Sequence, residues 1–201
     1  MVALVASASA DTLYENGPIR ADQEAWTINF GFAVSDSFYI AGPNATVNGF
    51  QFGGWVFPGD VIESVDLSIT SAEFGGTTFF DQQVSLTQSD CEANHLGLNT
   101  CLETATFSGV DLSQGTYWVN LQNAVVNNNN DPAYWDENTG IGCHSQNCPS
   151  QASENSVGTI PSESFSILGS SGGGTVPEPG SLLLFGSGIA ASFGILSRKL
   201  R

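Results

Sequence analysis

Hydrophobic and polar residues alternate strictly in the middle of the chain. The longest alternating run places five apolar side chains on one face, namely Trp26, Ile28, Phe30, Phe32 and Val34. The same period of two returns over residues 65–70 and 117–122. Because successive side chains of a β-strand point to opposite faces, each run predicts a half-buried strand. No stretch before residue 181 has a convincing helical period, so the pattern predicts an all-β domain.

Shorter apolar runs and turn signals complete this pattern. Further strand candidates cover residues 38–40, 46–52, 77–80, 83–87, 104–107 and 163–168. Turn residues separate the candidates at Gly42-Pro43-Asn44, Phe57-Pro58-Gly59-Asp60, Gly75-Gly76 and Ser108-Gly109. Short strands with such punctuation are typical of two antiparallel sheets packed face to face. We therefore expect an antiparallel two-sheet β-sandwich, jelly-roll-like, over residues 11–168.

Composition and charge narrow the classes of partner. Of the 201 residues, 20 are acidic and 4 are basic, which gives a formal net charge of −16. The hydrophobic content of 41% is sufficient for one core. A surface this acidic cannot supply the cationic contacts on which nucleic-acid affinity rests. Apart from three cations at the C-terminal end, Arg20 is the only basic residue, so we expect no nucleic-acid partner.

Four cysteines lie in the predicted domain as two close pairs. Cys91 and Cys101 bracket one polar loop, and Cys143 and Cys148 bracket another. In an oxidising compartment, an even number of closely spaced cysteines is typical of disulfides. Pairing of neighbours is the most favourable of the three connectivities, and each bridge would mainly hold the shape of its loop.

Two kinds of metal site are alternatives for the polar loops. His95 and His144 lie within the cysteine loops, but the spacings do not match the usual zinc clips, and oxidation would consume the thiolates first. Asp131, Asp136 and Glu137 offer oxygen ligands of the kind that calcium prefers, beside a run of asparagines. Because no D-x-D-x-D-G pattern is present, a solvated acidic loop is the simpler interpretation. We expect no cofactor, with calcium as the alternative.

The sequence contains none of the familiar catalytic motifs. It has no G-x-S-x-G nucleophile elbow, because the match to that spacing at residues 169–173 lies in a Gly/Ser-rich stretch, and it has no H-E-x-x-H and no phosphate-binding loop. Asp136 and Glu137 are adjacent, so on a strand they would point to opposite faces and would not flank one glycosidic bond. We therefore expect a protein without catalytic activity, and a secreted hydrolase with a distant acid and base is an alternative.

Three aromatic residues are candidates for a carbohydrate-binding surface. Trp118 alternates away from the predicted inward face of its strand, and Tyr134 and Trp135 follow a proline in a polar, acidic loop. Exposed aromatic rings stack on the apolar faces of sugars, while nearby amides and carboxylates bind hydroxyls. The alternative is a packing role, because tryptophan and tyrosine often complete the core of a two-sheet fold.

The first ten residues have the features of a truncated export signal. Residues 1–10 are apolar and then small, and Ala8-Ser9-Ala10 fits the small-x-small pattern that signal peptidase accepts. Cleavage there would leave Asp11 as the first residue. A short apolar first strand is the alternative interpretation.

The C-terminal end has three parts in a fixed order. A Gly/Ser-rich linker over residues 169–175 precedes Val176, Pro177, Glu178 and Pro179. The uncharged run 181–197 follows, and its seventeen residues would form a helix of roughly 26 Å, enough to cross a bilayer. Three cations follow, Arg198, Lys199 and Arg201, and we expect them to hold the C-terminus in the cytoplasm and so to place the preceding domain outside.

This order of motif, apolar helix and basic cluster over residues 176–201 resembles the PEP-CTERM sorting signal, also catalogued as an ice-binding protein C-terminal domain. The resemblance implies recognition by an exosortase, a membrane transpeptidase that processes the tail near Pro-Glu-Pro. It further implies export in a bacterium with an outer membrane, with inner-membrane anchoring during sorting and then a place at the cell surface or in the extracellular matrix.

The sequence thus indicates an exported, non-catalytic surface or matrix protein, structural or adhesive in exopolysaccharide or biofilm. The expected partners are signal peptidase and exosortase during export, the membrane through the C-terminal helix before processing, and exopolysaccharide afterwards. A carbohydrate-binding module that uses exposed aromatics is the main alternative.

Overall fold

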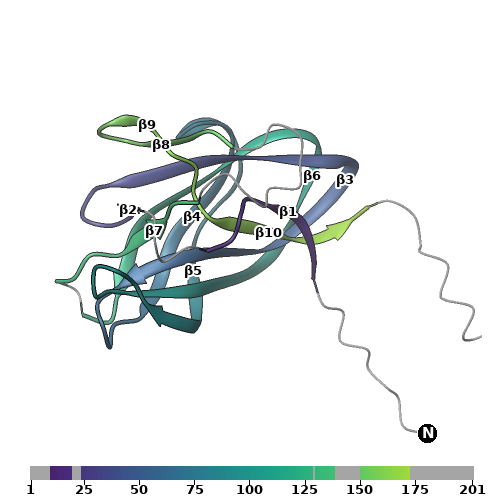
Figure 1. The fold of residues 1–201 in the computed structure, drawn as a ribbon. Coiled ribbons are helices and arrows are strands. Elements are labelled where there is room, and N and C mark those ends of the chain that lie inside the picture. Colours follow the sequence, from purple (N-terminus) through teal and green to yellow (C-terminus); the bar gives the residue numbers. More distant parts are fainter. Residues whose placement is uncertain (1–9, 20–23, 129, 139–149, 173–201) are drawn as a thin grey trace, which may run out of the picture.

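The computed structural model describes residues 10–19, 24–128, 130–138 and 150–172. These residues form an all-β structure of ten strands joined in one hydrogen-bonded antiparallel sheet (Figure 1). The strands are β1 (Asp11–Glu15), β2 (Ala25–Thr27), β3 (Ala33–Val56), β4 (Ile62–Ala72), β5 (Gly75–Ala93), β6 (Asn99–Val126), β7 (Tyr134–Asp136), β8 (Ala152–Glu154), β9 (Gly158–Ile160) and β10 (Phe165–Ser171). The predicted all-β, antiparallel class is confirmed for this part of the chain.

The long strands β3 and β6 form the centre of the sheet. They pair antiparallel from Ala33↔Gln122 to Val56↔Asn99. On the other side of β3, the first half pairs with β8 and the second half pairs with β10. On the other side of β6, the second half pairs with β4 and the first half pairs with β5. Each long strand therefore pairs with different strands along its two halves.

The ten strands make one hydrogen-bonded network rather than two separate sheets. Figure 1 shows that this sheet is strongly curled, as the twist of long strands and the register shifts within them produce. The division into the two layers of a sandwich stays a prediction. The predicted transmembrane helix over residues 181–197 lies outside the described residues, and the part that is described contains no helix suited to crossing a membrane.

One hydrophobic core lies inside the curled sheet. It collects inward side chains from β1, β3, β4, β6, β7 and β10. The predicted inward residues Val65, Leu67 and Ile69 of β4 are buried, as are Tyr117, Val119 and Leu121 of β6. Because the alternation of polar and apolar residues matches the strand period, these two predictions of strand and face are confirmed.

The prediction of one strand from Trp26 to Val34 is wrong. A tight turn at Asn29–Phe32 divides the run into the end of β2 and the start of β3, and the Phe32 N–H donates to the Asn29 carbonyl at 3.0 Å. Phe30 and Gly31 have φ angles of 57° and 90°, so both central residues of the turn are left-handed. Phe30 is consequently 58% exposed instead of facing the core.

Two of the four predicted turns are bulges inside long strands. The predicted turn at Gly42-Pro43-Asn44 lies within β3, where the pairing with β6 changes register between Ile40 and Asn44, and β3 continues beyond it. A second shift places residues 107–109 of β6 opposite Asn48 alone. The turn at 57–60 is confirmed, because it links β3 to β4. The hairpin of β4 and β5 turns at residues 73–74, so the predicted turn residues Gly75 and Gly76 are instead the first two residues of β5.

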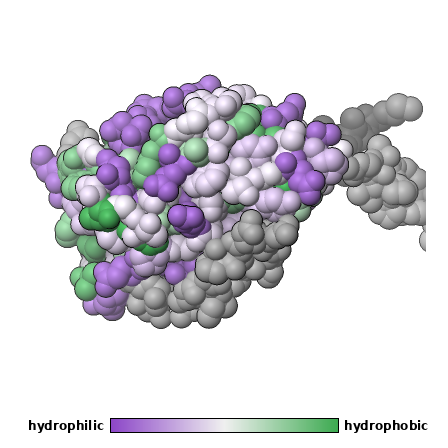
Figure 2. All heavy atoms as spheres, turned by 90° about the horizontal axis from the view of Figure 1, so that it is seen from above, coloured by the Kyte–Doolittle hydropathy of each residue, from purple (hydrophilic) through white to green (hydrophobic). Residues whose placement is uncertain are grey.

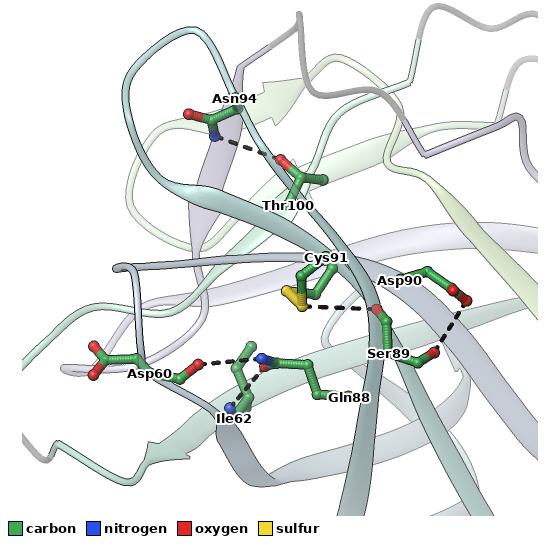
Figure 3. Close-up of a disulfide and its surroundings, with 9 residues drawn as sticks. Asp60, Ile62, Gln88, Ser89, Asp90, Cys91, Asn94 and Thr100 are labelled. Atoms are coloured by element: carbon green, nitrogen blue, oxygen red, sulfur yellow. Dashed lines mark hydrogen bonds between the residues drawn. A yellow bond between two sulfur atoms is a disulfide. The ribbon is translucent and has the colours of Figure 1, made fainter.

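The hairpin of β5 and β6 is closed by a disulfide. Cys91 and Cys101 are bonded, which confirms the predicted neighbour pairing for this pair (Figure 3). The same close-up shows Gln88 of β5 reaching the β3–β4 turn, where its amide donates to the Asp60 carbonyl at 3.1 Å. The disulfide therefore lies beside a second link that connects the hairpin to the neighbouring turn.

Both ends of the described domain lie next to each other. Asp11, the first residue of β1, pairs with Gly169 of β10 (Figure 1). Strand β10 continues through Ser171, and the Gly172 N–H donates to the Asn44 carbonyl at 2.7 Å. The first three residues of the predicted linker 169–175 therefore form a strand, which is a correction of that boundary.

The described residues present a predominantly polar surface on the face seen in Figure 2. Figure 2 shows a face on which hydrophilic and intermediate residues dominate, with small separate hydrophobic areas. Several of the large hydrophobic side chains that are exposed lie in turns, among them Phe30, Phe57, Leu96 and Val157. Isolated apolar residues of this kind are ordinary on a folded protein.

Candidate functional site

Four carboxyl groups meet near the junction of β3, β7 and β10, and we call them the carboxyl cluster. They are Asp36 of β3, Asp136 of β7, and Glu137 and Glu163 from the adjoining segments. Asp36, Asp136 and Glu163 are fully buried, and Glu137 is 7% exposed. The backbone brings them together, because the Glu163 N–H donates to Asp36 Oδ2 at 2.8 Å and the Ser164 N–H donates to the Asp136 carbonyl at 2.7 Å.

Asp36 is surrounded by hydrogen-bond donors. Its Oδ2 atom accepts from Asn16 Nδ2 and from Ser162 Oγ, each at 3.2 Å, and its Oδ1 atom accepts from the Ser37 N–H at 2.6 Å. Burial raises the pKa of Asp36 to about 7, although these hydrogen bonds act in the opposite direction. Asn16 also donates to the Glu163 carbonyl at 2.6 Å, so this one side chain links the N-terminal segment to the cluster.

Asp136 and Glu137 bind the indole groups of two tryptophans. Trp55 Nε1 donates to Asp136 Oδ1 at 2.7 Å, and Trp26 Nε1 donates to Glu137 Oε1 at 2.6 Å. Ser164 Oγ donates to the second oxygen of Asp136 at 2.9 Å. Burial raises the pKa of Glu137, and the hydrogen bond from Trp26 partly opposes that shift. Both carboxyl groups therefore fix large side chains of the fold.

Glu163 differs from the other members of the cluster. Both of its carboxyl oxygens are buried without a hydrogen-bond partner. Burial raises its pKa well above the usual value, and the neighbouring charges of Asp36, Glu137 and Asp136 raise it further. A buried carboxyl with no donor is stable only in its neutral, protonated form.

Glu103 of β6 is a second buried carboxyl group of this kind. Its two oxygens also lack partners, and burial raises its pKa to about 8. The adjacent glycines of β3 make room for both sites. A Cβ atom at Gly53 would lie 2.7 Å from the Asp136 Cβ, and one at Gly54 would lie 2.7 Å from the Glu103 Cγ. The glycine pair is therefore required for close packing on the acidic side chains.

The carboxyl cluster is enclosed, and its hydrogen bonds link separate segments of the fold. Its members accept hydrogen bonds from β1–β2 residues, from β3 and from the segment before β10, so they connect parts of the chain that are distant in sequence. A side chain without exposed surface cannot touch a substrate in this conformation. The arrangement can bind protons, and the protonation state of Asp36 and Glu163 is set by burial.

The predicted calcium ligands do not form one ligand set. Asp136 and Glu137 face the tryptophan donors, whereas Asp131 accepts from Asn128 Nδ2 at 2.7 Å. Asp131 lies near Asp60. Burial raises the pKa of Asp60, and the neighbouring Asp131 carboxylate raises it further. Within the described ranges, no group of three or more His, Cys, Asp or Glu side chains is arranged to hold a metal ion.

The three predicted carbohydrate-binding aromatics have different environments. Trp135 is fully buried, so the expectation that it is exposed is wrong. Its ring packs edge-on against Phe50, Phe52 and Phe165, and its Nε1 donates to the Ser164 carbonyl at 2.9 Å. Trp118 and Tyr134 are half-buried, and burial raises the pKa of Tyr134. Only these two retain exposed ring surface.

Some of the remaining predicted site residues lie among the described residues, and others lie outside them. Cys91 and Cys101 are consumed in their disulfide, which removes both from the zinc alternative. Cys143, Cys148 and His144 lie outside the described residues. So do the sorting motif Val176, Pro177, Glu178 and Pro179 and the cations Arg198, Lys199 and Arg201.

The sequence prediction did not identify Glu163 or Glu103 as buried. A signal was present for Glu103, because it occupies an inward position of the alternation between Cys101 and Ala105. The consecutive glycines Gly53 and Gly54 inside a strand were a second signal, since glycine in a strand often marks a close approach. Glu163 gives the same signal, because it alternates in phase with the inward residues Phe165 and Ile167 of the predicted strand 163–168.

Comparison with known proteins identifies the tail. Residues 175–199 match the family model described as the PEP-CTERM protein-sorting motif. This confirms the resemblance given by the residues themselves. This motif implies an exported protein that is sorted by an exosortase and directed to the cell surface. No curated protein matches the chain.

Proposed function

We propose that the protein is a non-catalytic component of the cell surface or extracellular matrix, with a structural or adhesive role in exopolysaccharide or biofilm. The observation that carries the proposal is the PEP-CTERM motif at residues 175–199, which follows a single β domain. An exosortase processes the tail, and the domain is what reaches the outside. Anchoring at the inner membrane precedes that step in a bacterium with an outer membrane.

The use of the buried acidic residues supports a role without catalysis. A catalytic carboxyl group must reach its substrate, but Asp36, Asp136 and Glu163 are fully buried. Two members of the carboxyl cluster hold tryptophan indoles, and a third accepts several hydrogen bonds. These groups stabilise a rigid domain, which is what a structural component requires.

The arrangement of the ends supports display on a single attachment. Because Asp11 pairs with Gly169, the start of the domain and its exit toward the tail lie at one place on the surface. The turns at 57–60 and 94–98 lie away from these end strands in Figure 1. A domain attached through residue 172 would therefore present those turns to the surroundings.

Deletion of residues 176–201 tests the sorting step. We expect the truncated protein to appear in the medium or the periplasm, whereas the intact protein is retained at the surface, as cell fractionation and immunoblotting would measure. Unchanged surface retention of the truncated protein would refute the proposal.

A second variant separates sorting from simple anchoring. Replacing Pro177, Glu178 and Pro179 by alanine leaves the apolar run and the three terminal cations intact. We expect this variant to remain unprocessed in the inner membrane, because the recognition motif is lost while the membrane segment is kept. If it is processed and delivered like the natural protein, the tail is an ordinary anchor.

Carbohydrate binding is the second candidate function. The half-buried rings of Trp118 and Tyr134 favour it, whereas the burial of Trp135 removes one of the three predicted aromatics. Neutral glycan binding that falls severalfold in Trp118→Ala or Tyr134→Ala would support this candidate. Binding that is unchanged in both variants would exclude these rings as the contact surface.

A further inference from the structure

A hollow opens on the surface where β5 changes its partner, and we call it the β5–β6 hollow. Strand β5 pairs with β4 up to Ser85↔Ser64 and with β6 from Leu86↔Ala105 onward. Before Leu86 of β5 and after Ala105 of β6 these two strands no longer pair, and the bulge at residues 107–109 of β6 lies in this unpaired part. The hollow has a volume of about 360 Å³, within the range of small-ligand sites.

The polar side chains that line the hollow are uncharged, and most of them make no hydrogen bond within the described part of the chain. Among the described residues, six of them are exposed and make no side-chain hydrogen bond, namely Gln82, Gln83, Ser85, Thr87, Thr106 and Ser108. A seventh, Thr104, accepts from Gln51 Nε2 at 3.1 Å. Amide and hydroxyl groups both donate and accept hydrogen bonds, so this set is complementary to a ligand that is rich in hydroxyl groups.

The hollow also has an apolar part. Phe107 lines it and contacts Phe80 with ring centroids 4.4 Å apart, and Val84 and Leu86 complete the apolar lining. Contact with Phe80, which is 6% exposed, ties Phe107 to the core and limits its movement. Val84 belongs to the core and Leu86 and Phe107 pack against it, so hydroxyl and amide groups provide most of the exposed surface of the hollow.

The charge of the protein favours neutral ligands over anionic ones at the β5–β6 hollow. The protein has a net charge of −16, and none of the residues lining the hollow is charged. An anionic polymer would be repelled by the molecule as a whole and would find no cation in the hollow. A neutral ligand has no such electrostatic penalty.

We propose that the β5–β6 hollow binds a neutral saccharide, such as a segment of an uncharged polysaccharide. The inference rests on the proposed function, which places the domain among extracellular polysaccharides, and it assigns the contact to this hollow rather than to Trp118 or Tyr134. Hydroxyl groups of the sugar bond to the exposed Gln, Ser and Thr side chains.

The test uses the full chain, purified in a detergent without a sugar headgroup. Binding of neutral glucans, galactomannan and mannan is compared with binding of alginate, an anionic polymer, by glycan array and isothermal titration calorimetry. The variant Ser85→Tyr fills the hollow, and Thr106→Val removes a hydroxyl group with little change in volume. The controls Thr116→Tyr and Thr116→Val alter an exposed residue of the same strand β6 outside the hollow.

We expect binding of at least one neutral polysaccharide, its loss in Ser85→Tyr, and about tenfold weaker binding in Thr106→Val, as the loss of one or two hydrogen bonds gives. Both Thr116 variants should bind as the natural protein does. Equal binding by the Ser85 and Thr116 variants, binding of alginate alone, or no binding at all would overturn the inference. Because the assay uses purified protein, its failure leaves the localisation experiments unaffected, and failure of sorting leaves the binding result unaffected.

Discussion

At the scale of single residues, several carboxyl groups of the protein are buried away from water. Glu163 and Glu103 have no hydrogen-bond partner, and Asp36 has several. Burial nevertheless raises the pKa of all three, to about 7 for Asp36 and about 8 for Glu103. Desolvation therefore outweighs hydrogen bonding even at Asp36.

These shifts predict that the folded state is more stable in mild acid than at alkaline pH. The folded protein binds protons that the unfolded chain has released, so the stabilisation is complete below pH 4 and is lost as the pH rises through 7 to 8. Each such group lowers the free energy of unfolding by up to about 1.4 kcal/mol per pH unit within its window. Urea unfolding at a series of pH values measures the slope.

The variant Glu103→Gln isolates one of these groups, because the amide is neutral at every pH. We expect a shallower dependence of the free energy of unfolding on pH between about 4.5 and 8 than in the natural protein. Glu63→Gln, which alters an exposed carboxylate, is the matched control and should keep the natural slope. Identical slopes in both variants would contradict the assignment of Glu103.

At the scale of elements, alternation revealed which side chains face inward but not where a strand bends or changes partner. The inward faces of β4 and the second half of β6 were predictable from periodicity alone. The bulges in β3 and β6 were not, because Gly42-Pro43 and Ser108-Gly109 have the composition of turns and only the pairing with the neighbouring strand keeps them extended.

The turn at Phe30 and the buried acids show the limit of residue preferences. Phenylalanine rarely adopts a positive φ, so nothing in the residue type predicts the break after β2. Aspartate and glutamate are rarely buried, so the prediction that Asp136 and Glu137 lie in a solvated or metal-binding loop followed the usual preference. The tryptophan donors that make their burial favourable come from β2 and β3, more than eighty residues away.

The glycine pair of β3 gives a test at this scale. Gly53→Ala would place a Cβ atom 2.7 Å from both Asp136 Cβ and Ser164 Oγ, so β3 and the carboxyl cluster would have to separate. We expect a loss of about 1 to 3 kcal/mol in the free energy of unfolding.

Gly42→Ala is the matched control on the same strand. Its nearest contact would be 3.9 Å, so it should have little effect in the same urea unfolding experiment. Equal stability of the two variants would show that the packing of β3 on Asp136 is not required.

At the scale of the whole molecule, charge is distributed very unevenly. All acidic residues except Glu178 precede the tail, and all basic residues except Arg20 follow residue 197. The exported domain is therefore almost purely anionic, which favours solubility and opposes self-association. An anionic domain and an acidic matrix polymer would attract each other only through a shared divalent cation.

This distribution predicts that divalent cations strengthen retention of the protein among acidic polysaccharides. Washing intact biofilm with a chelator should release more of the protein than washing with an equal concentration of sodium chloride, and added calcium should restore retention, as immunoblotting of the washes would measure. Equal release by chelator and salt would exclude cation bridging and leave the neutral hollow as the means of attachment.

The pairing of Asp11 with Gly169 has a consequence for the connectivity of the domain. Because the two ends of the domain are hydrogen-bonded neighbours, they could be joined without changing the fold, and the order of the strands in the sequence could then differ. A short linker between the two ends, with new termini opened at the turn over residues 57–60, would leave every strand pairing in place. We therefore expect the domain to tolerate circular permutation at this turn.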